Sequence, residues 1–172
     1  TKNVFVFKIS HIVLNSASSV FIASFANLST VALYSNYNML MSKVSSLFDG
    51  IFTGMGASIG NLIAEGNLDR VKAVFYELLS LRYYGAIICS LFLYFATSSI
   101  IAVWLGQEYV MSNILVVTLS VHVFIYQARL TVTNFKDSYA LFQDIWAPVT
   151  EVVLYVVLSL VLGYYIGFVG VL

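Results

Sequence analysis

Charged side chains are scarce in this sequence of 172 residues: Asp, Glu, Lys and Arg make up 9% of it, whereas hydrophobic residues make up 60%. A soluble domain carries charge on roughly a quarter of its positions. A single core in a chain of this length cannot bury so much apolar surface. Lipid must therefore cover the excess, and the composition predicts an integral membrane protein.

Cysteine, excess basic charge and catalytic motifs are also missing. The single cysteine, Cys89, lies in an apolar run, so an internal disulfide or a cysteine-based metal site is excluded and we expect a small buried side chain. Eight basic residues balance eight acidic ones, which argues against a nucleic-acid partner. No HExxH, GxSxG, phosphate-binding glycine loop or zinc-ligand cluster occurs. We therefore expect no enzyme, cofactor or metal site.

Long apolar stretches are what the sequence does have. Five of them reach the roughly 20 residues that a membrane-spanning helix needs: 4–25, 31–64, 83–105, 110–133 and 148–167. The pattern predicts an all-α bundle of about five transmembrane helices, with residues 1–172 forming a single transmembrane domain. Between the second and third spans, Asn67 or Asp69 is expected to cap an amphipathic helix that lies at the membrane surface.

Basic residues favour one orientation of these spans. They flank the start of the first span and occur in or near the second and fourth connections: Lys2, Lys8, Arg70, Lys72, Arg82, Arg129 and Lys136. The connections at 26–30 and 106–109 contain no Lys or Arg. The positive-inside rule therefore predicts a cytoplasmic N-terminus and an outer C-terminus for this chain.

Lys43 stands out because an ionisable group in hydrocarbon costs at least ~2.5 kcal/mol. It lies roughly 18 Å into the second span, on a stripe of polar or small residues with Asn36, Ser46, Gly50 and Thr53. One interpretation is that this stripe lines a water-filled cavity. The alternatives are that Lys43 pairs with Asp49 or another acid, or extends its amine to the membrane interface.

The first span carries a similar polar stripe, formed by Lys8, His11, Asn15 and Ser18 at intervals of three and four residues. If the two stripes face each other, they enclose a cavity whose lysines would attract an anionic substrate. For His11 a hydrogen-bonded packing role is the alternative to a proton relay.

Glycines follow in the second span at intervals of four, two and four residues: Gly50, Gly54, Gly56 and Gly60, with Ala57 and Ser58 beside them. Small residues at this spacing let helices approach each other closely. The second interpretation is a hinge at Gly50, Gly54 and Gly56 that a transporter uses in alternating access.

Several short segments occur in an order that resembles a known family. They are residues 31–37 and 57–62, Trp104–Leu105–Gly106 with Tyr109, Arg129, Phe135–Lys136–Asp137 and Leu141–Phe142–Gln143–Asp144. Together they resemble the flippases for O-antigen and capsular polysaccharide repeat units, which belong to the multidrug/oligosaccharidyl-lipid/polysaccharide exporter superfamily. The chain departs from that pattern at Ile145–Trp146–Ala147, where members of the family usually carry basic residues.

The resemblance implies a two-lobed transporter in the bacterial inner membrane, of which this chain would be an internal fragment holding about the first five helices of the second lobe. Such proteins move an undecaprenyl-diphosphate-linked oligosaccharide to the outer leaflet for surface polysaccharide synthesis. The implied partners are that substrate, membrane lipids and H+ or Na+ as coupling ion, with Lys43 in the cationic cavity.

Three other functions stay open. A drug or cation antiporter of the same superfamily would prefer acidic residues in its cavity. A membrane-bound enzyme of polysaccharide assembly would need catalytic groups in its loops, and the outer loops expected here are only a few residues long. A helix-bundle scaffold would tolerate the replacement of Lys43 by leucine.

Overall fold

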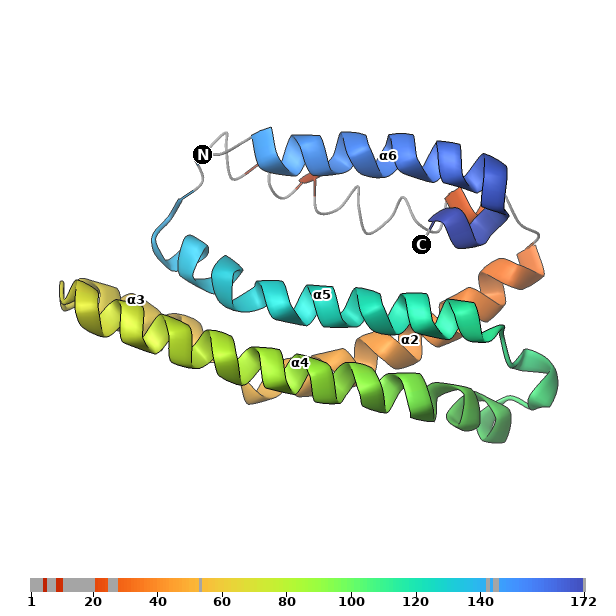
Figure 1. Ribbon diagram of the computed structural model, residues 1–172, viewed down its shortest axis with the longest axis horizontal. Helices are drawn as coiled ribbons and strands as arrows, with labels where there is room; N and C mark the ends of the chain where they lie inside the picture. Colours follow the sequence, from red (N-terminus) through yellow and green to blue (C-terminus); the bar gives the residue numbers. More distant parts are fainter. Residues whose placement is uncertain are drawn as a thin grey trace. The chain divides into compact units, whose positions relative to one another are not determined.

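The computed structural model describes the backbone of residues 5, 9, 10, 21–24, 28–52, 54–141, 143 and 146–171, and the side chains of all of these except 28, 168 and 169. Every element in these ranges is a helix: α2 (Leu28–Ile51), α3 (Met55–Ala64), α4 (Leu68–Trp104), the 3-10 helix η1 (Gln107–Tyr109), α5 (Asn113–Ser138), α6 (Trp146–Ile166) and the 3-10 helix η2 (Gly167–Val171) (Figure 1). The all-α prediction is confirmed for the part of the chain described here.

Three of the described helices, α4, α5 and α6, are long and apolar enough to cross a membrane, and the bent pair α2–α3 adds a fourth if it forms one span. Each of the last four predicted spans overlaps one of these helices. The first predicted span, 4–25, lies mostly outside the described residues.

Large apolar side chains are exposed on the spanning helices. On α4, Ile88, Phe92 and Phe95 are 68%, 53% and 72% exposed, and on α6 Leu154 and Leu158 are about half exposed. Such surfaces are unfavourable in water but favourable against lipid tails. They are what a membrane protein of this composition requires, and Cys89 on α4 is buried, as predicted.

The chain divides into two compact units, one of residues 36–141 and one of residues 1–35 with 142–172. In the second of these, α6 packs against η2, and the turn between them uses Gly167 at φ +73°. The ring of Phe21 meets Tyr155 of α6 edge to face, with centroids 6.2 Å apart. The first unit holds the residues that carry the arguments below.

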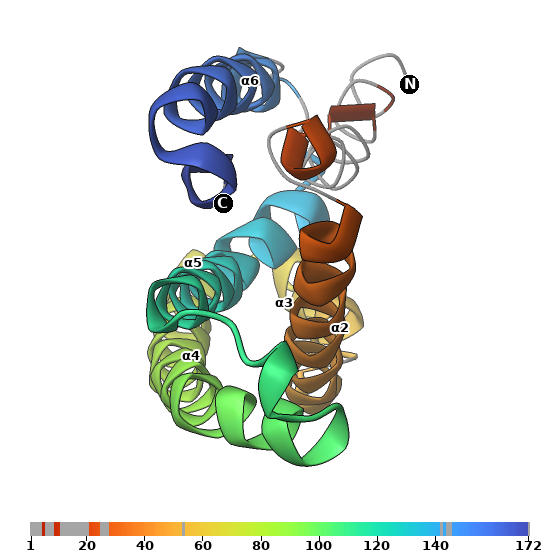
Figure 2. The same ribbon diagram turned by 90° about the vertical axis from the view of Figure 1, so that its right-hand side faces the viewer.

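In the unit of residues 36–141, α4 and α5 lie side by side along their length and run antiparallel (Figure 1). An end-on view shows α2 across from this pair (Figure 2). Few backbone positions of α2 approach the pair closely, so side chains make the connection. At Gly85 of α4, for example, the ring of Phe48 from α2 occupies the space that a Cβ would need.

The second predicted span is broken rather than continuous. Gly54 adopts φ +97°, a left-handed conformation that side chains disfavour, and it separates α2 from α3. The two helices meet at a bend of 41°. The amide N–H of Phe52 donates to the Asp49 carbonyl at 2.9 Å, which closes the end of α2 as a tight turn.

Helix α4 corrects a prediction. The segment 67–79 does not form a separate helix at the membrane surface, because α4 runs without a break from Leu68 to Trp104. Asn67 caps it, its side-chain oxygen accepting the Arg70 N–H at 3.0 Å. The segment contains no proline, and nothing in it interrupts the helical hydrogen bonds. At 1.5 Å per residue α4 is about 55 Å long, well beyond a hydrocarbon core of about 30 Å.

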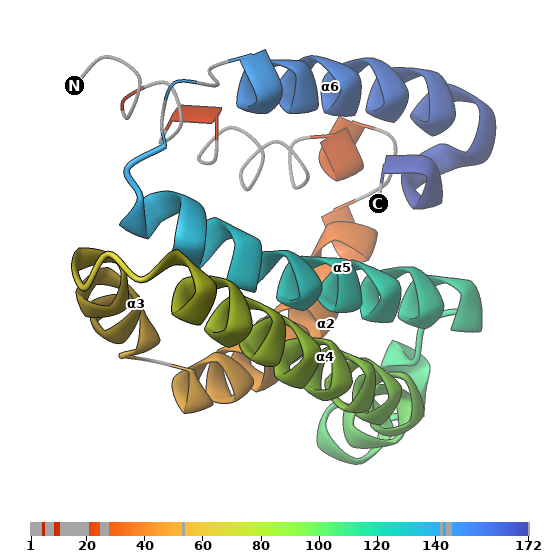
Figure 3. The same cartoon turned by 60° about the vertical axis from the view of Figure 1, so that its left-hand side comes forward.

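Helix α3 folds back beside the beginning of α4 after the turn that contains Gly66 (Figure 3). Ile59 and Leu62 of α3, Val71 of α4 and Phe135 of α5 form a buried apolar cluster there. This cluster joins the start of α4 to the end of α5. Arg70 and Lys72, which flank Val71, therefore lie at the same end of the unit as Lys136, which follows Phe135. The side of the membrane on which this end lies stays a prediction.

At the η1 end, Tyr37 of α2 is fully buried and its hydroxyl accepts the Met111 N–H at 2.9 Å. We expect Tyr37→Phe to lower the free energy of unfolding by about 1 kcal/mol, because it removes the acceptor of a part-buried amide. Thermal unfolding of the full-length protein in detergent would measure this. Tyr109→Phe is the matched control, since Tyr109 is 38% exposed. Equal losses in the two variants would contradict the role given to this hydrogen bond.

Candidate functional site

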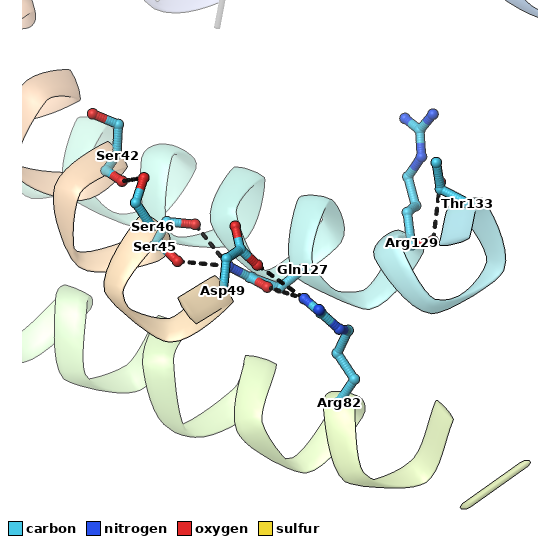
Figure 4. Close-up of polar contacts among 8 residues, drawn as sticks. All are labelled: Ser42, Ser45, Ser46, Asp49, Arg82, Gln127, Arg129 and Thr133. Carbon is cyan, nitrogen blue, oxygen red and sulfur yellow. Dashed lines mark hydrogen bonds and ion pairs between the residues drawn. The ribbon is translucent and has the colours of Figure 1, made fainter. Parts of the chain in front are cut away.

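The site begins with two residues one helical turn apart on α2. Ser45 and Asp49 are separated by four positions, so they lie on the same face of the helix. Ser45 is 6% exposed, and the Asp49 side chain is 30% exposed. Both lie on the side of α2 that meets α4 and α5 (Figure 4).

Arg82 of α4 supplies the positive charge of the site. Its side chain is 4% exposed, and Nη1 lies 2.9 Å from Asp49 Oδ1 and 2.8 Å from Gln127 Oε1. Since Nη1 carries two hydrogens, it can donate one to each acceptor. The guanidinium carbon lies 4.1 Å from the centroid of the Phe52 ring, a cation–π distance. A buried charge of this kind is stable only because it is paired and hydrogen-bonded.

Gln127 of α5 completes the connection. It is fully buried; its oxygen accepts from Arg82, and its Nε2 donates to the Ser45 hydroxyl at 2.8 Å and to the Ser45 carbonyl at 3.3 Å. Arg82 can only donate, so the amide oxygen must be the atom that faces it. The four residues form a chain of polar contacts that joins α2, α4 and α5, and the turn of α2 between Ser45 and Asp49 completes it as a ring. We call this ring, Ser45–Asp49–Arg82–Gln127, the polar ring.

The polar ring was not identified from the sequence, where Arg82 is placed in or near a connection. A signal for it does exist: Arg82 lies on the same helical stripe as the buried residues Ala86, Cys89 and Leu93, at intervals of four, three and four. A basic residue at a core position of a spanning helix requires a partner. Its two partners are 33 and 45 residues away in sequence, so only the tertiary structure reveals them.

The predicted cavity residues of α2 lie on a different face from the polar ring. Lys43, Ser46 and Gly50 are exposed, and Asn36 is half-buried. The Ser46 hydroxyl donates to the carbonyl of Ser42 in its own helix at 2.8 Å. Asp49 pairs with Arg82, and none of the ion pairs within the described residues involves Lys43. The alternative in which Lys43 pairs with Asp49 is therefore wrong, and pairing with an acid elsewhere in the protein stays a prediction.

The matching stripe of the first span falls on residues whose structure is not described: Lys8, His11, Asn15 and Ser18, as does Thr53 of the second span. That these residues face Lys43 stays a prediction.

The structure separates the glycines of the second span into two kinds, and whether any of them acts as a hinge stays a prediction. A Cβ added at Gly50, Gly56 or Gly60 would meet no described atom within 4 Å, so these glycines do not mediate close helix packing among the described residues. Gly54 is different, because it forms the bend between α2 and α3. At Gly85 of α4, in contrast, the side chain of Phe48 fills the position of a Cβ, so a ring and not a second helix backbone lies against this glycine.

Comparisons of the chain with models of protein families, with curated proteins and with solved structures found no match. The residues themselves must therefore indicate the chemistry. In the described ranges, His, Cys, Asp and Glu nowhere gather in threes that could hold a metal ion. What the unit offers is an ion pair inside the bundle, an exposed lysine along an apolar span, and a bend at Gly54 after the end of the helix that carries the lysine.

Proposed function

We propose that this chain belongs to a membrane transporter, and that its substrate is a lipid-linked oligosaccharide carried across the bacterial inner membrane by an undecaprenyl diphosphate. The chain would form part of one of two lobes that move relative to each other. The resemblance of its segments to the polysaccharide flippases supports this substrate class, and the placement of Lys43 supports transport.

The position of Lys43 is the observation that carries the proposal. The residue lies 15 positions after the start of α2, about 22 Å along the helix, and its side chain is exposed rather than packed within the unit. A lysine directed at lipid tails from such a depth is strongly disfavoured. A water-filled cavity between this face and other parts of the transporter removes that cost and gives the lysine an anionic ligand.

The polar ring favours an anionic over a cationic cargo. Asp49 is the acid nearest to Lys43 on α2, and it is already engaged by Arg82. An exporter of cationic drugs would need an acid directed into its cavity. On the face of α2 that holds Lys43, Ser46 and Gly50, the charge is positive. A diphosphate group meets this face with favourable electrostatics.

In the proposed mechanism the diphosphate binds at Lys43 while the oligosaccharide contacts polar side chains of the first two spans and the lipid tail stays in the bilayer. Movement of the two lobes relative to each other would then open the cavity to the opposite side. The polar ring keeps α2 attached to α4 and α5 during this movement, so these three helices move as one body.

The test uses the full-length protein in a strain that lacks its own flippase, with surface polysaccharide and lipid-linked repeat units quantified at matched membrane expression. Lys43→Ala is expected to lower surface polysaccharide roughly tenfold, since one charged hydrogen bond contributes about 1.5 kcal/mol. The precursor should accumulate in the inner leaflet. Lys43→Arg should retain most export because it keeps the charge.

Lys72→Ala is the control, an exposed lysine near the start of α4 and outside the predicted span. It should export at the wild-type level. Wild-type export by Lys43→Ala would remove Lys43 from the mechanism. If the wild-type protein restores no polysaccharide at all in this strain, the flippase proposal itself is wrong.

A further inference from the structure

A groove of about 450 Å³ lies between α4 and α5, on residues that the polar ring does not use. Tyr83 of α4 forms one wall, and its ring meets Phe124 of α5 edge to face at 6.3 Å between centroids. Arg129, Thr133 and Lys136 of α5 contribute the polar part of the lining. In Figure 4 the Arg129 side chain points away from Arg82, so the two arginines serve different surfaces.

The lining of the groove changes from apolar to cationic along α5. Its apolar end is at Phe124 and Ile125, and its cationic end is at Lys136, eleven positions later and about 16 Å along the helix axis. Arg129 and Lys136 are seven residues apart, so they lie on one face, two turns from each other. Ile125 is 51% exposed, which leaves the apolar end open at the surface of the helix pair.

This arrangement matches an amphiphile with a negative head. Arginine and lysine are the side chains that bind phosphate oxygens, and the Thr133 hydroxyl can add a hydrogen bond. Both Arg129 and Lys136 have other interactions in the chain. One partner does not saturate them, because a guanidinium carries five N–H donors and an ammonium three.

We propose that this groove binds a membrane phospholipid with an anionic headgroup, its phosphate between Arg129 and Lys136 and the beginning of an acyl chain along Phe124 and Ile125. A free phosphate would use only the cationic end and leave the apolar lining unexplained. The site is separate from Lys43, and the proposal does not depend on what the protein transports.

Native mass spectrometry of the full-length protein, released from nanodiscs that contain phosphatidylglycerol and phosphatidylcholine, measures which lipid is retained. The wild type is expected to keep phosphatidylglycerol selectively. Arg129→Gln/Lys136→Gln should bind it about ten- to thirtyfold more weakly, in line with the contribution of two basic residues near an anionic membrane surface. Arg129→Lys/Lys136→Arg, which keeps both charges, should retain the lipid.

Arg70→Gln/Lys72→Gln is the matched control, because it removes the same charge from exposed positions outside the groove. It should behave like the wild type. The proposal would be overturned if the control lost phosphatidylglycerol as much as the groove variant does, or if the groove variant retained it as well as the wild type does. It would also be overturned if the wild type retained phosphatidylcholine as well as phosphatidylglycerol. Glycerol 3-phosphate added to lipid-free protein separates the two phosphate sources: if it binds as tightly as the lipid, the site recognises a soluble phosphate and the lipid assignment is wrong.

Discussion

Replacement of Arg82 by alanine is expected to lower the free energy of unfolding by about 3 kcal/mol, the lower end of what breaking a buried ion pair costs. The variant leaves Asp49 without its cation and Gln127 Oε1 without its donor inside the bundle. The lower end applies because the Asp49 side chain is 30% exposed and part of its charge remains solvated. Thermal or denaturant unfolding of the full-length protein in detergent provides the measurement.

The chain offers a matched control for this prediction. Arg70 also forms an ion pair, with Glu65 at 2.6 Å, but the two side chains are 62% and 50% exposed. Arg70→Ala should cost less than about 1 kcal/mol, because exposed pairs contribute little. Combining Arg82→Ala with Asp49→Ala should recover part of the loss, since the carboxylate that Arg82 neutralises is then absent as well. Similar losses for Arg70→Ala and Arg82→Ala would contradict the burial of the polar ring.

Gly54→Val is expected to destabilise the bend between α2 and α3 by about 2–3 kcal/mol, because a β-branched residue is a strong outlier at positive φ. The backbone at Gly54 has φ +97°, and no described atom blocks the space around it, so the cost arises from backbone conformation alone. The unfolding midpoint should fall, and hydrogen exchange around residues 52–55 should increase.

Gly56→Val separates this effect from the loss of a glycine as such. Gly56 is helical and also has open space around it, so valine there should change stability by less than about 0.5 kcal/mol. If the bend serves transport, Gly54→Val should also reduce polysaccharide export while Gly56→Val preserves it. Equal stability of the two variants would show that the left-handed conformation at Gly54 is not required.

Hydropathy was enough to locate most of the helices in the described residues. The predicted spans 110–133 and 148–167 differ from α5 and α6 by no more than five residues at either end. The continuity of α4 was missed because Arg70, Lys72 and Arg82 make its first part polar, as a connection would be. Polarity does not interrupt a helix, however, and the apolar positions of this part pack against α3 and α5.

The candidate site was only partly predictable. Lys43 could be singled out because a single charge in an apolar run is visible without a structure. The polar ring could not, since it depends on which face of α4 meets which face of α5. Gly54 is an intermediate case. The sequence places a possible bend within a run of glycines, but only the backbone angle at Gly54 shows at which of them the bend lies.

The length of α4 has a mechanical consequence. The centre of the predicted span 83–105 lies about 39 Å along the helix from Leu68, so a tilt of about 10° around that centre would carry Leu68 through about 7 Å. Because the helix is unbroken, a tilt within the span displaces its N-terminal end by this distance. Ile59 and Leu62 of α3 pack on Val71 near that end of α4, so α3 moves with it. Small rearrangements within the bilayer would therefore be amplified at this end, where a pair of spectroscopic labels could follow them.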